Sequence, residues 1–211
     1  MRTLLGIASI AILASTPALA QSHHVSLAAK SVANGGGSKQ DNSQSSSGRT
    51  DSFGRGYTQT QSTRVHEQTH QTSVEITVRN FGKEPENIEV QWFFIGASVE
   101  QSSRQEIIDS GKKDLQILGS KTTVFVATST PVKSSIISAT TTGQSNGVGS
   151  NRSYLPTSST KRVGTKMKGW IVRLVADGTV IQSVGSTSYF KELGADSKKL
   201  DNMERRPTSA F

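Results

Sequence analysis

The segment RVHEQTHQT, residues 64–72, contains the pattern H-E-x-x-H, which occurs in zinc-dependent peptidases. On a helix, two histidines four residues apart share one face and bind one zinc ion, while the glutamate activates the zinc-bound water. His66 and His70 would be the ligands here, and Glu67 would be the general base. The motif therefore requires a helix at this point and a third protein ligand elsewhere in the chain.

The residues around the motif predict a strand instead of a helix. Its neighbours are glutamine, serine and threonine, which offer no apolar stripe on which a helix could dock. On a strand, His66 and His70 point to one side and Glu67 points to the other, so the base is carried away from any metal. No histidine follows His70 that could serve as a third ligand. A zinc-dependent peptidase is therefore kept only as the alternative function.

Other catalytic arrangements are missing from the sequence. There is no cysteine nucleophile, no glycine-flanked serine elbow and no phosphate-binding loop. The acidic residues are dispersed along the chain, so their positions do not identify a glycosidase-like pair of carboxylates. His23 and His24 are neighbours but lack further oriented ligands. We nominate no catalytic, cofactor-binding or metal-binding residue, and we expect no cofactor and no enzymatic activity.

The chain is basic, with a formal net charge of +8. Most of its lysines and arginines are scattered, but one modest cluster consists of Lys161, Arg162, Lys166 and Lys168. Such a cluster suits an anionic glycan or an acidic protein partner, and it equally suits a solvated strand face.

Residues 1–20, MRTLLGIASIAILASTPALA, have the basic start, short apolar core and small-residue ending of a secretory signal peptide. We therefore expect an exported protein, located in the periplasm, on the cell surface or outside the cell. Export argues against a nucleic-acid partner, and no later run is apolar enough to span a membrane. The absence of cysteine excludes disulfides, so the fold depends on an ordinary core.

The mature chain divides into three segments by composition. Residues 21–56 hold a candidate first strand followed by a glycine- and serine-rich stretch, which predicts a flexible segment because it offers almost no apolar surface to bury. Residues 57–193 alternate between polar and apolar positions as strands do. Residues 194–211 predict a C-terminal tail.

Within residues 57–193, several elements are expected. Alternation is clearest at Val74, Ile76 and Val78, and the run 88–95 is apolar on both faces near its end, which is typical of a central strand. The pair Asp177-Gly178 predicts a two-residue hairpin. Further short strands are expected at QEIID, DLQIL, TTVFVATS and VKSSIISATTT, a long surface loop at residues 143–165, and a helical turn through Phe190 and Leu193.

The order of VEITVRNFGKEPENIEVQWFF and the hairpin GWIVRLVADGTVIQ resembles that of bacterial immunoglobulin-like domains. The resemblance covers roughly residues 57–190 and implies an all-β, immunoglobulin-like antiparallel β-sandwich with long flexible loops and with Trp92 in the core. The chain is also similar to small exported proteins of Verrucomicrobia that have been linked to pilus-type surface structures, although its mature N-terminus lacks the long apolar helix of a pilin.

These observations predict a non-enzymatic structural or interaction module of the bacterial cell envelope or surface, as an accessory of pilus-type assemblies. Its partner would be an envelope protein, bound through sheet faces, loops or edges, or a second copy of the chain, joined through exposed strand edges. A glycan-binding adhesion domain is a further alternative, which requires Tyr57, Tyr154 or Tyr189 on the surface.

Overall fold

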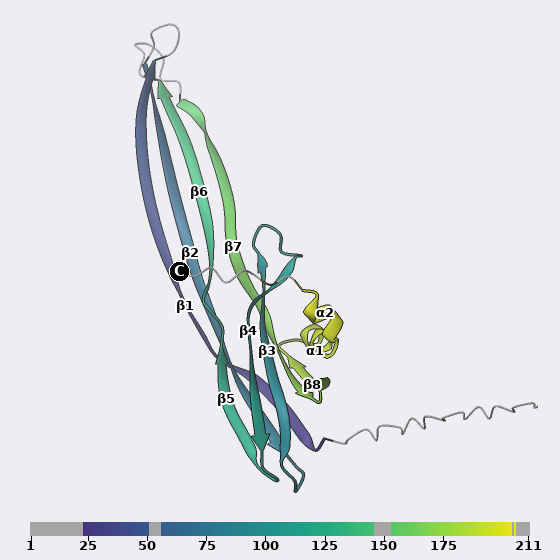
Figure 1. The fold of residues 1–211 in the computed structure, drawn as a ribbon. Coiled ribbons are helices and arrows are strands. Elements are labelled where there is room, and N and C mark those ends of the chain that lie inside the picture. The colour runs from purple at the N-terminus through teal and green to yellow at the C-terminus, as the bar shows by residue number, and fades with distance from the viewer. Residues whose placement is uncertain (1–22, 51–55, 146–152, 204, 206–211) are drawn as a thin grey trace, which may run out of the picture.

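The computed structural model describes residues 23–50, 56–145, 153–203 and 205, and within them the chain is mostly antiparallel β-sheet (Figure 1). The predicted signal peptide lies outside these residues. No helix of the described part is long and apolar enough to cross a membrane. The elements, in chain order, are β1 (Val25–Thr50), β2 (Gly56–Asn80), β3 (Glu86–Ser98), β4 (Gln105–Ile117), β5 (Thr122–Thr128), β6 (Val132–Ser145), β7 (Ser153–Ala176), β8 (Thr179–Gly185), α1 (Ser188–Ala195) and α2 (Ser197–Asp201).

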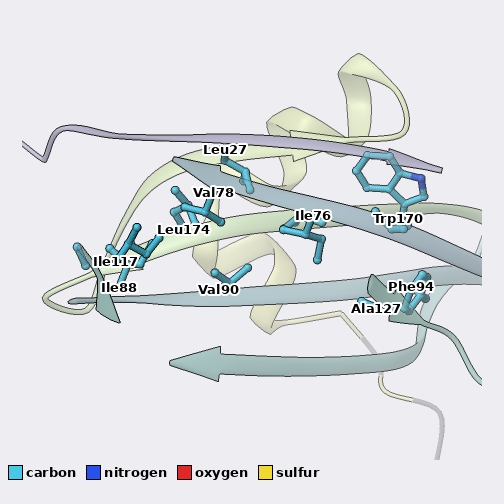
Figure 2. Packing of buried hydrophobic residues seen from close by; sticks show 13 residues of the cluster. Leu27, Ile76, Val78, Ile88, Val90, Phe94, Ile117, Ala127, Trp170 and Leu174 are labelled. Atoms are coloured by element: carbon cyan, nitrogen blue, oxygen red, sulfur yellow. The ribbon is translucent and has the colours of Figure 1, made fainter. Parts of the chain in front are cut away.

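The lower part of the molecule, here called the body, comprises residues 23–33, 73–131, 165–203 and 205. In it, one sheet of order β1-β2-β5 faces a second sheet of order β4-β3-β7-β8. Alternate residues from both sheets fill the space between them, as Figure 2 shows. The buried residues of this first cluster include Leu27, Val74, Ile76, Val78, Ile88, Val90, Phe94, Ile117, Ala127, Trp170, Val172 and Leu174.

A second cluster covers the opposite face of the β3 and β7 sheet. There α1 and α2 lay Phe190, Leu193 and Leu200 against the strands. Their partners on the strands are Phe93, Ile95, Ile107 and Ile171. The central strands are therefore buried on both faces, which confirms the expectation drawn from the apolar run 88–95. Trp92 packs at the margin of the first cluster, half-buried, with its ring edge-on to Phe125 at 5.9 Å between centroids.

The upper part, here called the arm, comprises residues 34–50, 56–72, 132–145 and 153–164. It is a single four-stranded sheet of order β1-β2-β6-β7 that projects well beyond the body (Figure 1). At about 3.4 Å per residue, its strands extend roughly 50 Å. The arm and the body are continuous because β1, β2 and β7 run through both.

The two sheets of the body separate where β7 passes from the arm into the body and changes its pairing partner. Up to Gly164, β7 pairs with β6, and from Thr165 onward it pairs with β3. Gly164 has φ +101°, and a Cβ there would lie 2.3 Å from the carbonyl oxygen of Lys133, so only glycine fits this turn. On the other side, β5 and β6 both pair with β2 and are separated by Ser129–Pro131. Below this point, no strand of the described chain pairs with the outer side of β5.

Two predicted loops are wrong. Residues 34–50, expected to be flexible, continue β1, and most of residues 143–165, expected to be a surface loop, belong to β6 and β7. Both segments were predicted to be loops because they have few apolar side chains that could be buried. In the structure, the ladder is specified by backbone pairing, because β1 is in register with β2 from Val25 opposite Asn80 to Thr50 opposite Gly56.

Three smaller expectations have clear outcomes. QEIID and DLQIL are one strand, β4, because SGKK pairs with β3 instead of turning. The Asp177-Gly178 hairpin between β7 and β8 is confirmed, with φ +50° and +74°, as a type I′ turn requires. The helical turn is confirmed as α1, with Phe190 and Leu193 buried, and α2 is an additional helix in the segment expected to be a tail.

Candidate interaction surface

The arm has no hydrophobic core of its own. In the described ranges 35–48, 58–71, 133–143 and 156–164, no side chain is buried, and the buried arm residues Thr72 and Val132 lie where the arm meets the body. Neither core cluster contains an arm residue. Hydrogen bonds of the backbone hold the four strands together, assisted by polar cross-strand contacts such as Ser46 Oγ to Thr60 Oγ1 at 3.1 Å. A sheet that exposes both faces offers nearly all its side chains for contact with something else.

Paired residues of neighbouring strands share a face, so the register defines two faces of the arm. The His66 face carries, in one row across the sheet, Gln40, His66, Ile136 and Arg162. The Glu67 face carries, in the adjacent row, Lys39, Glu67, Ser135 and Val163. Both faces are dominated by serine, threonine and glutamine, with a few aliphatic side chains near the body.

The His66 face contains a shallow polar hollow of about 580 Å³. The side chains of the His66 face that line this hollow are those of Asn42, Gln44, Ser62, Arg64, Ser138 and Thr140. Arg64 Nε donates a hydrogen bond to Asn42 Oδ1 at 3.3 Å, which holds its guanidinium against the sheet. The hollow lies over the middle of the arm and presents hydroxyl, amide and guanidinium groups together, which suits a polar partner surface.

The H-E-x-x-H residues lie on β2, as the sequence predicted. His66 and His70 are on one face and Glu67 is on the other. Four residues along a strand span about 13 Å, whereas the zinc-ligand bonds to two histidines are each about 2 Å long. Gln68 Nε2 lies 3.2 Å from His66 Nε2, and Glu67 pairs with Lys133 at 3.6 Å. Among the residues that the structure describes, no three histidine or acidic side chains gather around a common metal position.

His23 has a structural contact that sequence reasoning missed. Its Nδ1 lies 3.1 Å from Glu86 Oε2, and its Nε2 lies 3.9 Å from Asp177 Oδ2. His24 contributes its backbone, which accepts a hydrogen bond from Phe81 N at 2.7 Å. The pair therefore fastens the start of β1 to the body.

The predicted basic cluster is divided by the fold. Its four side chains are all exposed along β7. Lys161 and Arg162 lie on opposite faces of the arm, opposite Ile137 and Ile136 respectively. Lys166 and Lys168 follow the turn at Gly164 and belong to the body sheet. The sequence run therefore forms two separate pairs of charges along one strand.

A polar network on the body was not predicted. Arg173 is buried between the β3 and β7 sheet and α2, with its guanidinium 5.1 Å from the Phe93 ring centre. It donates to Gln91 Oε1 at 2.5 Å and pairs with Asp201 at 3.5 Å. The single arginine inside the apolar run WIVRLVA is the signal that could have revealed it.

Glu89 extends this network toward solvent. A hydrogen bond from Lys112, 2.9 Å away, and a second from Gln91 hold the pKa of Glu89 below its ordinary value. The same contact with Glu89 raises the pKa of Lys112. The network fastens α2 and β4 to the central strands, and its contacts are those of a structural ion-pair network.

Comparison with known proteins adds little to this description. No family model matches the chain, and neither does any curated protein. Among solved structures, a β-glucuronidase from Bacteroides uniformis bound to cyclophellitol-6-carboxylate aziridine is 15% identical over 56% of this chain, with a TM-score of 0.25. DesR, a β-glucosidase from Streptomyces venezuelae in complex with D-glucose, is 13% identical over 69% of this chain, with a TM-score of 0.26.

The chain spans 13% and 14% of the lengths of these two glycosidases. With TM-scores so far below 0.5, the likenesses carry no argument about the fold or the activity of this protein.

Proposed function

We propose that this protein is an exported, non-enzymatic structural or interaction module of a bacterial cell envelope or surface, with the arm as its contact element. The observation that carries the proposal is the arm itself. Four strands extend far past the body, and none of their described arm residues belongs to either core cluster, so the arm does not serve to complete the core. We propose further that the body is an immunoglobulin-like sandwich, supported by its two facing antiparallel sheets.

The chemistry of the arm favours a polar protein partner. Hydroxyl and amide groups on both faces can donate and accept hydrogen bonds in many directions, which suits a polar partner surface laid against either face. An accessory role in a pilus-type assembly is compatible with this shape, because a long sheet can lie along an extended partner. The zinc-peptidase alternative lacks support, since the two histidines and the glutamate diverge on β2.

An arm-shortened variant tests this function. Residues 37–69 are replaced by Asn-Gly, joining Gly36 to His70, and residues 136–162 are replaced by Asn-Gly, joining Ser135 to Val163. The mature full chain and the variant are each immobilised and exposed to solubilised envelope of the source bacterium. The full chain is expected to retain a defined set of envelope proteins that the variant does not retain.

The variant is first checked for folding by thermal melts and by the fluorescence of Trp92 and Trp170, which both lie in the body. A charge control, Lys161→Ser with Arg162→Ser, separates loss of the arm from loss of basic groups. The proposal fails if the folded variant retains the same proteins as the full chain, or if the full chain retains none.

A further inference from the structure

The outer edge of β5 differs from the outer edges of β1 and β4 in the body and of β1 and β7 in the arm. Exposed sheet edges in monomeric proteins are normally protected by charge, proline or a covering element, because an open edge recruits further strands. In the body, Gln182 closes the edge of β1 by accepting from Leu27 N at 2.9 Å and donating to Leu27 O at 3.3 Å. The edge of β4 carries the charged residues Asp109, Lys112, Lys113 and Asp114.

The arm edges are protected as well. The part of β7 that lies in the arm contains Pro156, Lys161 and Arg162, and the part of β1 that lies there contains Lys39, Asp41 and several glycines. By contrast, β5 reads TTVFVAT, with no charge, no proline and no glycine, and with mainly strand-favouring residues. Among the described strands, it pairs with β2 alone, and it lies at the margin of the molecule in Figure 1.

The side chains of β5 also remain uncovered on the outer face. Val124 and Val126 are each 55% exposed, while Phe125 and Ala127 point inward toward the core. The neighbours of the two valines across β2 are Thr77 and Glu75. The strand therefore presents two adjacent apolar side chains beside an open edge.

The sequence of β5 is nearly symmetrical about Phe125. In an antiparallel pair of two copies centred on this residue, Val124 lies opposite Val126, Thr122 opposite Thr128, and Thr123 opposite Ala127. In each pair, both residues lie on the same face of the sheet, either the outer face or the core-facing one. The two copies of β5 therefore form a continuous sheet with one outer face. Lys121, just before the strand, would lie opposite Ser129, so no like charges meet there. A two-fold interface requires this kind of self-complementarity.

We propose that β5 is a self-association strand, which joins two copies of this chain across a two-fold axis through Phe125. The pairing forms one continuous sheet of order β1-β2-β5-β5-β2-β1 and gathers four valines on its outer face, where β-branched cross-strand pairs are favourable. Because β5 leads directly into β6, antiparallel pairing directs the two arms to opposite ends of the dimer. The dimer then presents a contact element at each end.

Analytical ultracentrifugation of the mature full chain, from micromolar to millimolar concentration, tests the proposal. The protein is expected to sediment as a monomer–dimer equilibrium. Val124→Lys with Val126→Lys places lysines opposite lysines across the axis and is expected to weaken dimerisation at least about tenfold. Val124→Glu with Val126→Lys places opposite charges across the axis, and the lysine at position 126 lies beside Glu75 of its own copy. This double variant is expected to keep the dimer. Both variants change only exposed side chains.

The register is tested by cross-linking, since the chain has no cysteine. An oxidised mixture of Val124→Cys and Val126→Cys chains is expected to form a disulfide-linked dimer, whereas either variant alone is expected to cross-link far less. A wild-type chain that remains monomeric overturns the proposal, as does a dimer that the double-lysine variant leaves unchanged. Equal cross-linking of either variant alone overturns the two-fold register. The arm-shortened variant retains β5, so it is expected to dimerise even if it binds no envelope partner.

Discussion

At the scale of single residues, the body depends on a few buried polar side chains that join several elements. Asn80, at the end of β2, is fully buried. Its Nδ2 donates to the carbonyl oxygens of Glu84 at 2.7 Å and Ile117 at 3.0 Å, and its Oδ1 accepts from Gly82 N at 2.7 Å. One side chain thereby connects β2, the following turn and the end of β4.

Replacing Asn80 by alanine leaves these three backbone groups without their partner. We expect the free energy of unfolding to fall by on the order of 2–4 kcal/mol, because each buried group left unpaired costs about 1–3 kcal/mol and water can compensate some of them. Urea denaturation followed by tryptophan fluorescence measures the change. The exposed Asn87→Ala variant is the control and is expected to change stability by no more than about 0.5 kcal/mol. Equal midpoints for the two variants would contradict the role of the buried amide.

The contact between Glu89 and Lys112 predicts a dependence of stability on pH. Because the folded state lowers the pKa of Glu89 from its ordinary value of 4.5, its contribution is present above that value and is lost as pH falls through the folded pKa. Lys112→Met removes the largest cause of the lowered pKa. The difference in melting temperature between wild type and variant is therefore expected to be largest near neutral pH and to shrink in acid.

The effect should be small, since the Lys112 side chain is 70% exposed and salt screens such pairs. Lys83→Met, another exposed lysine, controls for the loss of one positive charge. A difference between wild type and Lys112→Met that grows below pH 4.5 would have the wrong sign for this mechanism.

At the scale of elements, the sequence predicted the strands that are rich in β-branched residues or alternate clearly, and it failed where a paired segment is rich in glycine and serine. The alternation at Val74, Ile76 and Val78, the doubly apolar run of β3 and the Asp177-Gly178 turn all report local packing or local turn chemistry. The arm portion of β1 is rich in glycine, serine and asparagine, which have low strand propensity. It is a strand because β2 lies beside it, and such long-range pairing leaves no periodic signal in a polar segment.

This difference in what holds the strands predicts a difference in local stability. Amide protons of the arm, such as those of residues 58–70 in β2, are expected to exchange with solvent at least about tenfold faster than those of residues 170–175 in β7, because few apolar contacts oppose local opening. Hydrogen exchange of the wild-type protein, read by mass spectrometry of peptides, measures both rates. Equal protection of the two segments would mean that arm and body open as one cooperative unit.

At the scale of the whole molecule, the candidate surface could be predicted only in part. The strand assignment of residues 64–72 followed from the lack of an apolar stripe for a helix, and the separation of Glu67 from the histidines followed from the period of two along a strand. The division of the basic cluster required knowledge of the turn at Gly164, and the open edge of β5 required the sheet order. Both depend on where β7 changes partners, which is a property of the complete topology and not of any local stretch.

The lack of a hydrophobic core in the arm also affects how the length of such a chain can change during evolution. A strand in a packed domain cannot gain residues without disturbing its neighbours in the core. In the arm, an insertion of two residues in each of the four strands keeps every side chain on its original face of the sheet and creates no void. Each such step would move the tip about 7 Å further from the sandwich. Related chains of one ancestry can thus differ in reach by regular increments while their folded base stays the same.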